Sequence, residues 1–309
     1  MPYVYNPLQQ NHLYSIFFAP RGSKRMVQLG MQLAQLHLSP FDKLIGVMGE
    51  AGSGKSLLIK GMFPGLELTN DDEGVNIRPL PILDIENAGF YSNHTYHIDV
   101  RFESAFTQLG ELAEAVQSAL KLGKRVVVEH FDLLYPFLSK RNADILIGVG
   151  AEVVITRPSI FGPLPDEVAK ISFDTIKFRK MAHTAEDLMQ QLLLNMTSEN
   201  YEHSDVRNGF VLRFGKKPEL DLPLLSSQMR GLIESDLSVS YADETHIYIG
   251  DQLHYCTGPR IHVRSTGGIE VFNLLDRVLY DSHDDKYLLV GLVGKRGQTI
   301  DEDLNRIVF

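Results

Sequence analysis

The first half of the chain consists of short apolar runs that are separated by segments with helical spacing of apolar residues. Short apolar runs bounded by turn residues are typical of buried strands, and their alternation with helices is typical of an α/β fold with a mostly parallel sheet. The runs lie at 13–18, 43–48, 65–69, 94–103, 124–132, 143–148 and 152–157. The pattern therefore predicts a sheet of about six strands.

Helical spacing is found between several of these runs. Apolar residues recur at intervals of three and four over 23–38 and 103–122, and a helical segment includes 57–62. Ser23 is a candidate N-cap of the first helix, and Gly123 ends the second. These helices connect consecutive strands of the predicted sheet.

The pattern changes between Pro158 and Arg179. A turn-rich stretch at 162–166 is followed by an alternating run at 171–178, which predicts a strand that crosses to a new unit. Helical spacing then resumes over 184–196, so that His183 and Asp187 lie one turn apart on one helix face. We expect two domains, 1–178 and 179–309.

The turn that follows the second apolar run has the form G-x-x-x-x-G-K-S from Gly49 to Ser56. Glycines in such a turn let backbone N–H groups surround a polyphosphate at the start of a helix. Lys55 is expected to reach the outer phosphates, and the Ser56 hydroxyl is expected to bind Mg²⁺. The residues expected to contact ATP are Gly49, Glu50, Ala51, Gly52, Ser53, Gly54, Lys55, Ser56 and Leu57.

Two carboxylates lie on later strands. Asp99 can hold Mg²⁺ directly or through water, although an edge strand with a polar face also explains it. Glu129 ends the run Val126–Val128 and can order or deprotonate the attacking water, or support the Mg²⁺ shell. Lys55, Glu129 and Asp99 are therefore the candidate catalytic residues.

The composition is that of a globular protein, with 44% hydrophobic and 22% charged residues among 309. One cysteine, Cys256, excludes an internal disulfide and fits a reducing cytoplasm. We expect a cytoplasmic protein without a signal peptide or membrane span. A net charge of −9 disfavours non-specific nucleic-acid binding.

The motif of Gly49–Ser56, the segment Tyr96-His97-Ile98-Asp99 and the acid Glu129 together resemble the TsaE ATPases of bacterial threonylcarbamoyladenosine synthesis. The resemblance covers about 23–157 and implies that the loop binds ATP, that Asp99 and Ser56 serve Mg²⁺, and that Glu129 supports hydrolysis. It also implies protein partners of the tRNA-modification type. The Trp-Pro usual after the acid in that family is His130-Phe131 here, and no counterpart of its S-P-T-F switch segment stands between Asn70 and Pro81.

The second half resembles the second additional domain of threonyl- and alanyl-tRNA synthetases and of free-standing editing proteins. The resemblance rests on His183-Thr184-Ala185-Glu186-Asp187 and on a turn with Cys256, Gly258, Pro259, His262 and Val263. It implies an α+β domain and a zinc site formed by His183, Asp187, Cys256 and His262. An aspartate replaces the family's second histidine, and two extra residues separate the cysteine from the histidine, so an ordinary buried cysteine without a metal is the alternative.

Three functional classes follow for a P-loop domain that precedes such an α+β domain. The first is an ATP hydrolase or ATP-dependent switch whose second domain recognises an amino acid or aminoacyl-tRNA. The second is a small-molecule kinase, in which Asp71 or Asp72 activates a hydroxyl. The third is an aminoacyl-tRNA deacylase that ATP regulates. We favour the first, with ATP, Mg²⁺ and Zn²⁺ as the expected cofactors.

Overall fold

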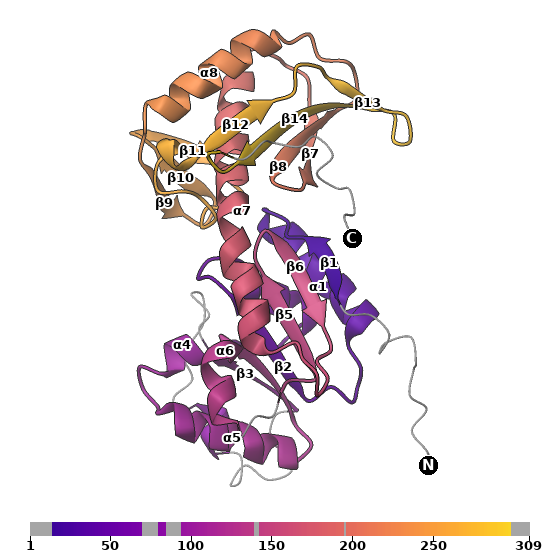
Figure 1. Ribbon diagram of the computed structural model, residues 1–309, viewed down its shortest axis with the longest axis vertical. Coiled ribbons are helices and arrows are strands. Elements are labelled where there is room, and N and C mark those ends of the chain that lie inside the picture. Colours follow the sequence, from indigo (N-terminus) through magenta and orange to yellow (C-terminus); the bar gives the residue numbers. More distant parts are fainter. Residues whose placement is uncertain (1–13, 70–79, 85–93, 139–141, 195, 298–309) are drawn as a thin grey trace. The chain divides into compact units, whose positions relative to one another are not determined.

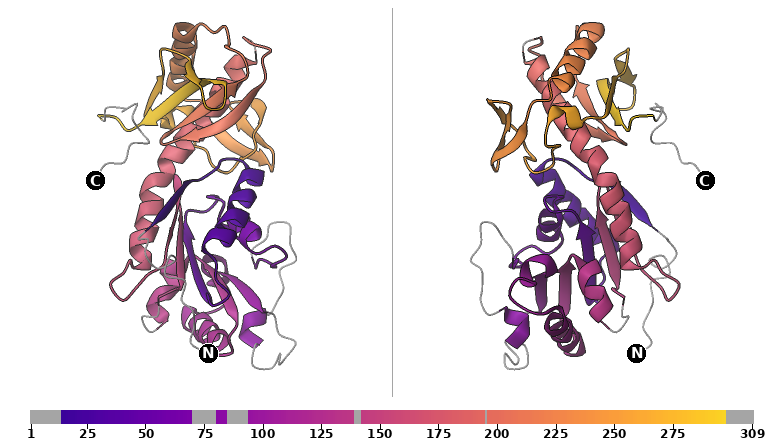
Figure 2. Two further views of the ribbon diagram at one scale, coloured as in Figure 1. Left: turned by 90° about the vertical axis from the view of Figure 1, so that its right-hand side faces the viewer. Right: turned by 60° about the vertical axis from the view of Figure 1, so that its left-hand side comes forward.

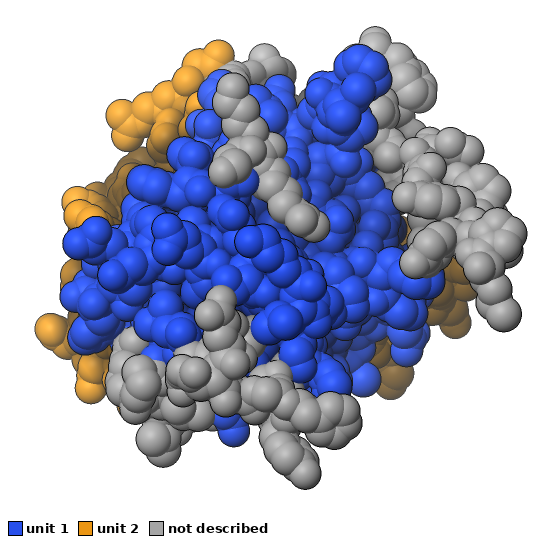
Figure 3. Space-filling model, turned by 90° about the horizontal axis from the view of Figure 1, so that it is seen from below, with its two compact units in different colours: residues 1–19, 23–174 blue, residues 20–22, 175–309 orange. Residues whose placement is uncertain are grey.

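A computed structural model describes residues 14–69, 80–84, 94–138, 142–194 and 196–297 (Figure 1). The chain divides into two compact units, which Figure 3 draws in different colours. Unit 1 comprises residues 1–19 and 23–174, and unit 2 comprises residues 20–22 and 175–309. The short segment 20–22 therefore belongs to unit 2 although unit 1 residues precede and follow it.

Unit 1 contains a mixed sheet in the strand order β1-β6-β5-β2-β4-β3. Its strands are β1 (Ser15–Phe18), β2 (Leu44–Gly49), β3 (Thr95–Asp99), β4 (Arg125–Glu129), β5 (Ile145–Val149) and β6 (Glu152–Thr156). Strands β3, β4, β2 and β5 run parallel, whereas β6 and β1 add antiparallel pairs. Strand β2 lies inside the sheet and is buried throughout, as its apolar sequence predicts.

Helices cover both faces of this sheet, because neighbouring side chains of a strand point to opposite faces. Leu44 and Met48 of β2 belong to one core cluster and Ile45 and Val47 to another. The helices are α1 (Ser23–His37), α2 (Lys55–Met62), α4 (Val100–Glu103), α5 (Leu109–Lys121) and α6 (Phe131–Leu134). Helix α5 packs in the first cluster, and α1 with α2 packs in the second; Figure 2 shows the sheet between these layers.

Helices α1 and α2 approach closely through two glycines. A Cβ at Gly30 would lie 2.3 Å from the carbonyl oxygen of Leu58, and one at Gly61 would lie 2.1 Å from that of Val27. Both distances are shorter than any real contact of a Cβ atom, so only glycine permits this separation of the two backbones. Helix α1 is thus seated directly on the helix that follows the glycine-rich turn.

Unit 2 is an α+β arrangement around the C-terminal part of α7 (Pro165–Leu193). One antiparallel sheet has the order β11-β10-β9, and a second has β12-β14-β8-β7 with β13 paired to β14. These strands are β7 (Tyr201–Val206), β8 (Gly209–Phe214), β9 (Val239–Asp243), β10 (His246–Ile249), β11 (Gln252–Tyr255), β12 (Val271–Leu274), β13 (Leu279–Asp281) and β14 (Lys286–Gly294). Helix α8 (Leu222–Glu234) contributes to the same core, and the Asp221 side chain caps its first turn.

The structure confirms most of the predicted elements of unit 1, including the sheet of six strands. Three predictions are wrong. Residues 65–69 form no strand, the strand expected over 94–103 ends at Asp99 and continues as α4, and the run 171–178 is helical. The run lies inside α7, where the buried residues Val168, Ser172 and Ile176 are four positions apart. That spacing places them on one face of a helix.

Helix α7 also begins well before the helix predicted at 184, and the division between the units falls inside it, after Asp174. Among the described residues, no helix combines the length and the apolar character needed to cross a membrane.

Candidate functional sites

The first candidate site surrounds the glycine-rich turn between β2 and α2. Gly49, Gly52 and Gly54 all have positive φ angles, of 146°, 78° and 94°. Other residues rarely adopt these values, so the glycines are needed for the path of the loop. At Gly49 a Cβ would in addition lie 2.6 Å from the carbonyl oxygen of Val149. The loop therefore depends on glycine at three positions before it reaches the first turn of α2.

The first two residues of α2 are directed at the end of β4. The Ser56 hydroxyl donates a 2.9 Å hydrogen bond to Oε1 of Glu129. The ammonium of Lys55 is 5% exposed, lies 3.7 Å from Oε2 of Glu129 and donates to the carbonyl of Glu50 at 3.1 Å. A buried cation, a hydroxyl and a carboxylate thus meet beside the glycine-rich loop. All three were predicted as site residues from the sequence.

His97 is a further member of this group that the sequence reasoning left without a role. Its Nδ1 accepts a hydrogen bond from the backbone N–H of Thr69 at 3.1 Å, so the ring proton is on Nε2. Nε2 lies 3.3 Å from Oε1 of Glu129 and donates to it. The alternation of His97 and Asp99 along β3 places both on one face of the strand, which is the signal that was available.

The surroundings of Glu129 favour its ionised form. Burial alone would raise the pKa of this carboxyl, but the hydrogen bond from His97, the charge of Lys55 and the hydrogen bond from Ser56 together lower it. Glu129 is therefore a carboxylate whose Oε1 already holds the Ser56 hydroxyl. This geometry suits support of a cation at Ser56 better than removal of a proton from water.

Asp99 ends β3, and His130 directly follows Glu129 at the end of β4. Asp99 is opposite Glu129 in the β3–β4 ladder, and its Oδ1 accepts from the N–H of Phe102 at 3.1 Å. His130 is 6% exposed and has a left-handed backbone, with φ 56°. Burial, followed by the nearby charge of Lys55, lowers its imidazole pKa to about 4. His130 is therefore neutral at physiological pH.

The remaining predicted residues of the loop differ in their burial. Ser53 is buried, Glu50 and Leu57 are half-buried, and Ala51 is exposed. Leu57 packs against the core beneath α1 and α2, so it contributes mainly to packing. Asp71 and Asp72, the acids of the kinase hypothesis, lie outside the described residues.

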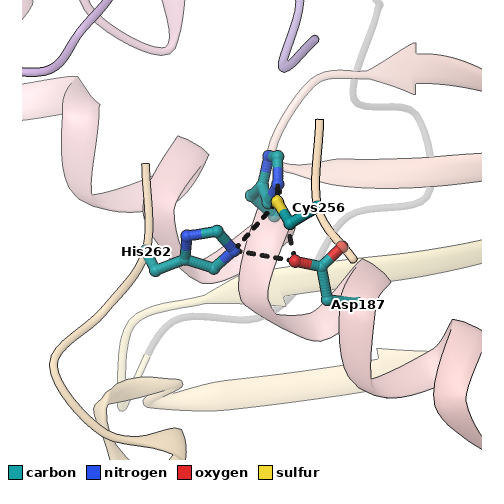
Figure 4. A group of neighbouring side chains, drawn as sticks. Asp187, Cys256 and His262 are labelled. Carbon is teal, nitrogen blue, oxygen red and sulfur yellow. Dashed lines mark hydrogen bonds and ion pairs between the residues drawn. The ribbon is translucent and has the colours of Figure 1, made fainter. Parts of the chain in front are cut away.

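The second candidate site lies in unit 2, where four side chains converge (Figure 4). His183 and Asp187 come from α7, and Cys256 and His262 come from the loop after β11. One donor atom of each lies within 4.8 Å of all the others. The structure thus brings together the four residues that the sequence predicted as a zinc site.

The separations between these donors fit a tetrahedral ion. Nε2 of His183 lies 3.0 Å from Sγ of Cys256 and 3.6 Å from Oδ2 of Asp187. Nε2 of His262 lies 2.8 Å from the same oxygen and 3.7 Å from Sγ. Ligands at 2.0–2.3 Å from a tetrahedral zinc are separated by roughly 3.3–3.8 Å. The distances of 3.6 and 3.7 Å fall within that range, and those of 3.0 and 2.8 Å are shorter.

The contact between His262 and Asp187 requires a proton or a cation between the two facing atoms. Its Nδ1 lies 3.2 Å from the carbonyl oxygen of Pro259, which only accepts, so Nδ1 carries the proton. In a neutral ring Nε2 then presents its lone pair to the Asp187 carboxylate 2.8 Å away. Two lone pairs at this distance repel each other unless a proton or a metal ion lies between them.

The other two donors are neutral in the protein without an ion. Burial lowers the pKa of His183 well below its usual value, and the neighbouring His262 and Arg21 lower it further. Burial also raises the pKa of the Cys256 thiol, with the negative charge of Asp187 as the next cause. A bound cation would lower the pKa of the Cys256 thiol, because it stabilises the thiolate.

The loop that carries Cys256 and His262 is fixed against α7. The hydroxyl of Thr184 accepts the N–H of Val263 at 3.2 Å, and the N–H of Gly258 donates to Sγ of Cys256 at 3.3 Å. A Cβ at Gly258 would lie 2.0 Å from the carbonyl oxygen of Arg21. Glycine is therefore required where the loop passes that segment.

Arg21 is buried beside this site and holds the acid next to Asp187. Its Nε donates to Oε2 of Glu186 at 2.7 Å, and its Nη2 lies 3.1 Å from Asp205. A third bond runs from Nη1 to the carbonyl of Gly209 at 3.0 Å. Glu186 also contacts Nδ1 of His203 at 2.9 Å, so both of its oxygens already have a partner in Arg21 or His203. Nothing in the sequence pattern indicated this role for Arg21.

His254 is a further residue that the sequence pattern did not single out. It stands two positions before Cys256, and its Nε2 lies 4.0 Å from Oδ1 of Asp187. The signal was the His-x-Cys spacing, which places both side chains on one face of an extended segment.

The sequence was also compared with known proteins. No protein-family model matches it, and no curated protein matches it.

Proposed function

We propose that unit 1 binds ATP with Mg²⁺ and hydrolyses it, and that the chain acts as an ATP-dependent switch. The observation that carries this proposal is the hydrogen bond from Ser56 to Glu129, with the Lys55 ammonium 3.7 Å from the same carboxylate. The Ser56 proton is committed to Glu129, which leaves its oxygen lone pairs for a hard cation. Lys55 then carries positive charge for the outer phosphates.

The P-loop NTPase fold is the arrangement that fits these contacts. Strand β2 is parallel to β4 and β5, and the loop at its carboxyl end leads into α2. Ligands of parallel α/β sheets bind at the carboxyl ends of the strands. Asp99 and Glu129 end the neighbouring strands β3 and β4 at this same edge. The resemblance to TsaE ATPases implies that both residues serve the nucleotide site.

Phosphate release from Mg-ATP by the purified chain tests the proposal. We expect release without any added acceptor, and no release by the Lys55→Ala variant. ADP formation only with an added hydroxyl compound would favour a kinase instead. Hydrolysis of alanyl- or seryl-tRNA in the absence of ATP would favour a deacylase.

For unit 2 we propose a zinc site formed by His183, Asp187, Cys256 and His262. The convergence of one donor atom from each of these residues within 4.8 Å supports it, and Nε2 of His262 lies 2.8 Å from Oδ2 of Asp187. Two imidazoles, a thiolate and a carboxylate are ligands that Zn²⁺ accepts, and their burial excludes competing water. The resemblance to the second additional domain suggests that this unit recognises an amino acid or an aminoacyl group.

Elemental analysis of protein purified without chelators tests the zinc site. We expect about one zinc per chain, and we expect none in Cys256→Ser. Thermal-shift measurements with each amino acid, with and without Mg-ATP, then test the recognition role. A wild-type protein without metal under these conditions would contradict the zinc site while leaving the ATP proposal intact.

A further inference from the structure

His254 is placed beside the proposed zinc site by the strand that leads to Cys256. It lies in β11 opposite Ile247 of β10, and Ile247 is fully buried. The N–H of Cys256 donates to the carbonyl of Thr245 at 2.8 Å, so the extended pairing continues beyond β11 to the cysteine. Because side chains two positions apart on a strand share a face, His254 and Cys256 point to the same side.

The Nε2 atom of His254 is buried and has no hydrogen-bond partner among the described residues. Leaving a buried polar nitrogen unpaired destabilises the folded chain, so such an atom calls for an explanation. Oδ1 of Asp187 lies 4.0 Å from it. That distance is about 1 Å longer than a hydrogen bond, so a small movement of either side chain would allow one to form.

The other oxygen of Asp187 faces the proposed ion. Oδ2 is the atom that lies 2.8 Å from His262 and 3.6 Å from His183, whereas Oδ1 faces His254. The terminal torsion of an aspartate is broad, so a turn of the carboxylate can move Oδ1 by about 1 Å at little cost. The carboxylate is rigid, so the same turn shifts Oδ2 by a similar distance, and a bound cation would hold the carboxylate in the turned orientation.

We propose that His254 is a positioning residue of the metal site: its Nε2–H donates to Oδ1 of Asp187 and holds the carboxylate with Oδ2 alone toward the ion. This inference rests on the proposed zinc site. Groups outside the ligand set that orient the ligands commonly change metal affinity by about 10- to 100-fold. Here the arrangement is inverted relative to the usual one, because the imidazole is the outer group and the carboxylate is the ligand.

Two variants of His254 and one matched control test the proposal in the full-length chain. His254→Ala removes the donor, whereas His254→Gln keeps an amide N–H close to the position of Nε2. His203→Ala is the control, because His203 contacts Glu186, the carboxylate beside Asp187 on the same helix. Zinc affinity is measured by competition with a chromophoric chelator, and coordination is followed by the absorption of bound Co²⁺.

We expect zinc affinity to fall about 10- to 100-fold in His254→Ala, with a smaller loss in His254→Gln and little change in His203→Ala. The effect of His254→Ala should disappear in an Asp187→Ala background, since the two residues act through one contact. The Co²⁺ spectrum should remain that of a tetrahedral ion in wild type and in His254→Gln, because His254 is not a ligand.

Zinc binding that Cys256→Ser abolishes but His254→Ala leaves unchanged would overturn this inference alone. A five-coordinate Co²⁺ spectrum that becomes tetrahedral in His254→Gln would also overturn it, by making His254 a ligand. Absence of zinc binding by the wild-type chain would overturn both this inference and the metal site on which it rests.

Discussion

The hydroxyl of Ser56 donates a 2.9 Å hydrogen bond to Oε1 of Glu129, which lies 73 positions further along the chain. The same oxygen accepts a second hydrogen bond from Nε2 of His97 at 3.3 Å. Glu129 is thereby held by two donors that belong to different elements, α2 and β3. A substitution at Glu129 should therefore alter the position of the Ser56 hydroxyl more than it alters the Lys55 charge that binds the phosphates.

Replacing Glu129 by glutamine should preserve Mg-ATP binding and slow phosphate release by about 10²-fold or more. The amide keeps the shape of the side chain but supplies one acceptor where the carboxylate supplied two. Binding by calorimetry and turnover by phosphate release measure the two effects separately. Asp132→Asn is the comparison, because Oδ1 of Asp132 is buried without a partner in the described structure. A loss of turnover in that variant and not in Glu129→Gln would transfer the role to Asp132.

Replacing Lys55 by alanine should abolish detectable ATP binding, and it should also lower the melting temperature of unit 1, because the buried Glu129 carboxylate loses its neighbouring cation. The ammonium is 5% exposed and contributes charge to the phosphate site, and it is not part of an apolar core. Lys60→Ala, in the last turn of the same helix, should bind ATP normally. Unchanged nucleotide affinity in Lys55→Ala would contradict the phosphate-binding assignment.

Gly30→Ala should destabilise unit 1, because the added Cβ would lie 2.3 Å from the carbonyl oxygen of Leu58. Moving α1 away from α2 to relieve this overlap should cost roughly 1–3 kcal/mol. Gly110→Ala in α5 is the matched control, since no atom lies within 4 Å of a Cβ there. That change should be neutral or stabilising by up to about 1 kcal/mol. Urea denaturation midpoints compare the two, and equal midpoints would contradict the close packing of α1 on α2.

Unit 1 should lose stability as the pH falls from about 6.5 toward 4, partly through His130. Its pKa in the folded chain is lowered to about 4, so between these values the unfolded chain binds the extra proton. Above pH 6.5 the imidazole is neutral in both states and does not affect the free energy of unfolding. As the pH decreases toward 4, proton binding to the unfolded chain lowers that free energy progressively. His130→Asn removes the titration and tolerates the left-handed backbone. Its unfolding free energy should therefore fall less between pH 7 and pH 4.5 than that of wild type, and an equal fall would contradict the assignment.

Zinc binding to unit 2 should release a proton from Cys256. Burial raises the pKa of the thiol, so it is protonated before the ion binds, and the thiolate is the ligand. The apparent affinity should then rise with pH, by about tenfold per pH unit for each proton released. Calorimetry in buffers of different ionisation enthalpy counts the protons. Zinc binding that is independent of pH between 6 and 8 would mean that the thiol is not a ligand.

Local patterns in the sequence were sufficient for the glycine-rich turn and the elements beside it. A buried run, a turn that needs glycine and a helix start are each determined within a few residues, and the structure has β2 and α2 where they were predicted. The strand at 171–178 failed because Ile171 and Phe173 are exposed apolar residues, and their alternation concealed the helical set beneath. Exposed apolar side chains carry no signal that separates them from buried ones.

Contacts between distant segments were much harder to predict. His183 and Cys256 were paired only through a resemblance, and spacing alone does not reveal that Nε2 and Sγ lie 3.0 Å apart. His97 and His254 were overlooked because strand alternation indicates which residues share a face but not what that face meets. Arg21 was unpredictable for a related reason, since its partners Glu186 and Asp205 lie far along the chain.

The position of Arg21 limits how the chain can be divided. A fragment that begins at Thr175 contains the whole continuous part of unit 2 but lacks the cation that Glu186 and Asp205 surround. Removing one partner of a buried ion pair costs about 3–5 kcal/mol, a large share of the stability of a small domain. The C-terminal half alone is therefore not an independent domain, because residues 20–22, from near the start of the chain, form part of its interior.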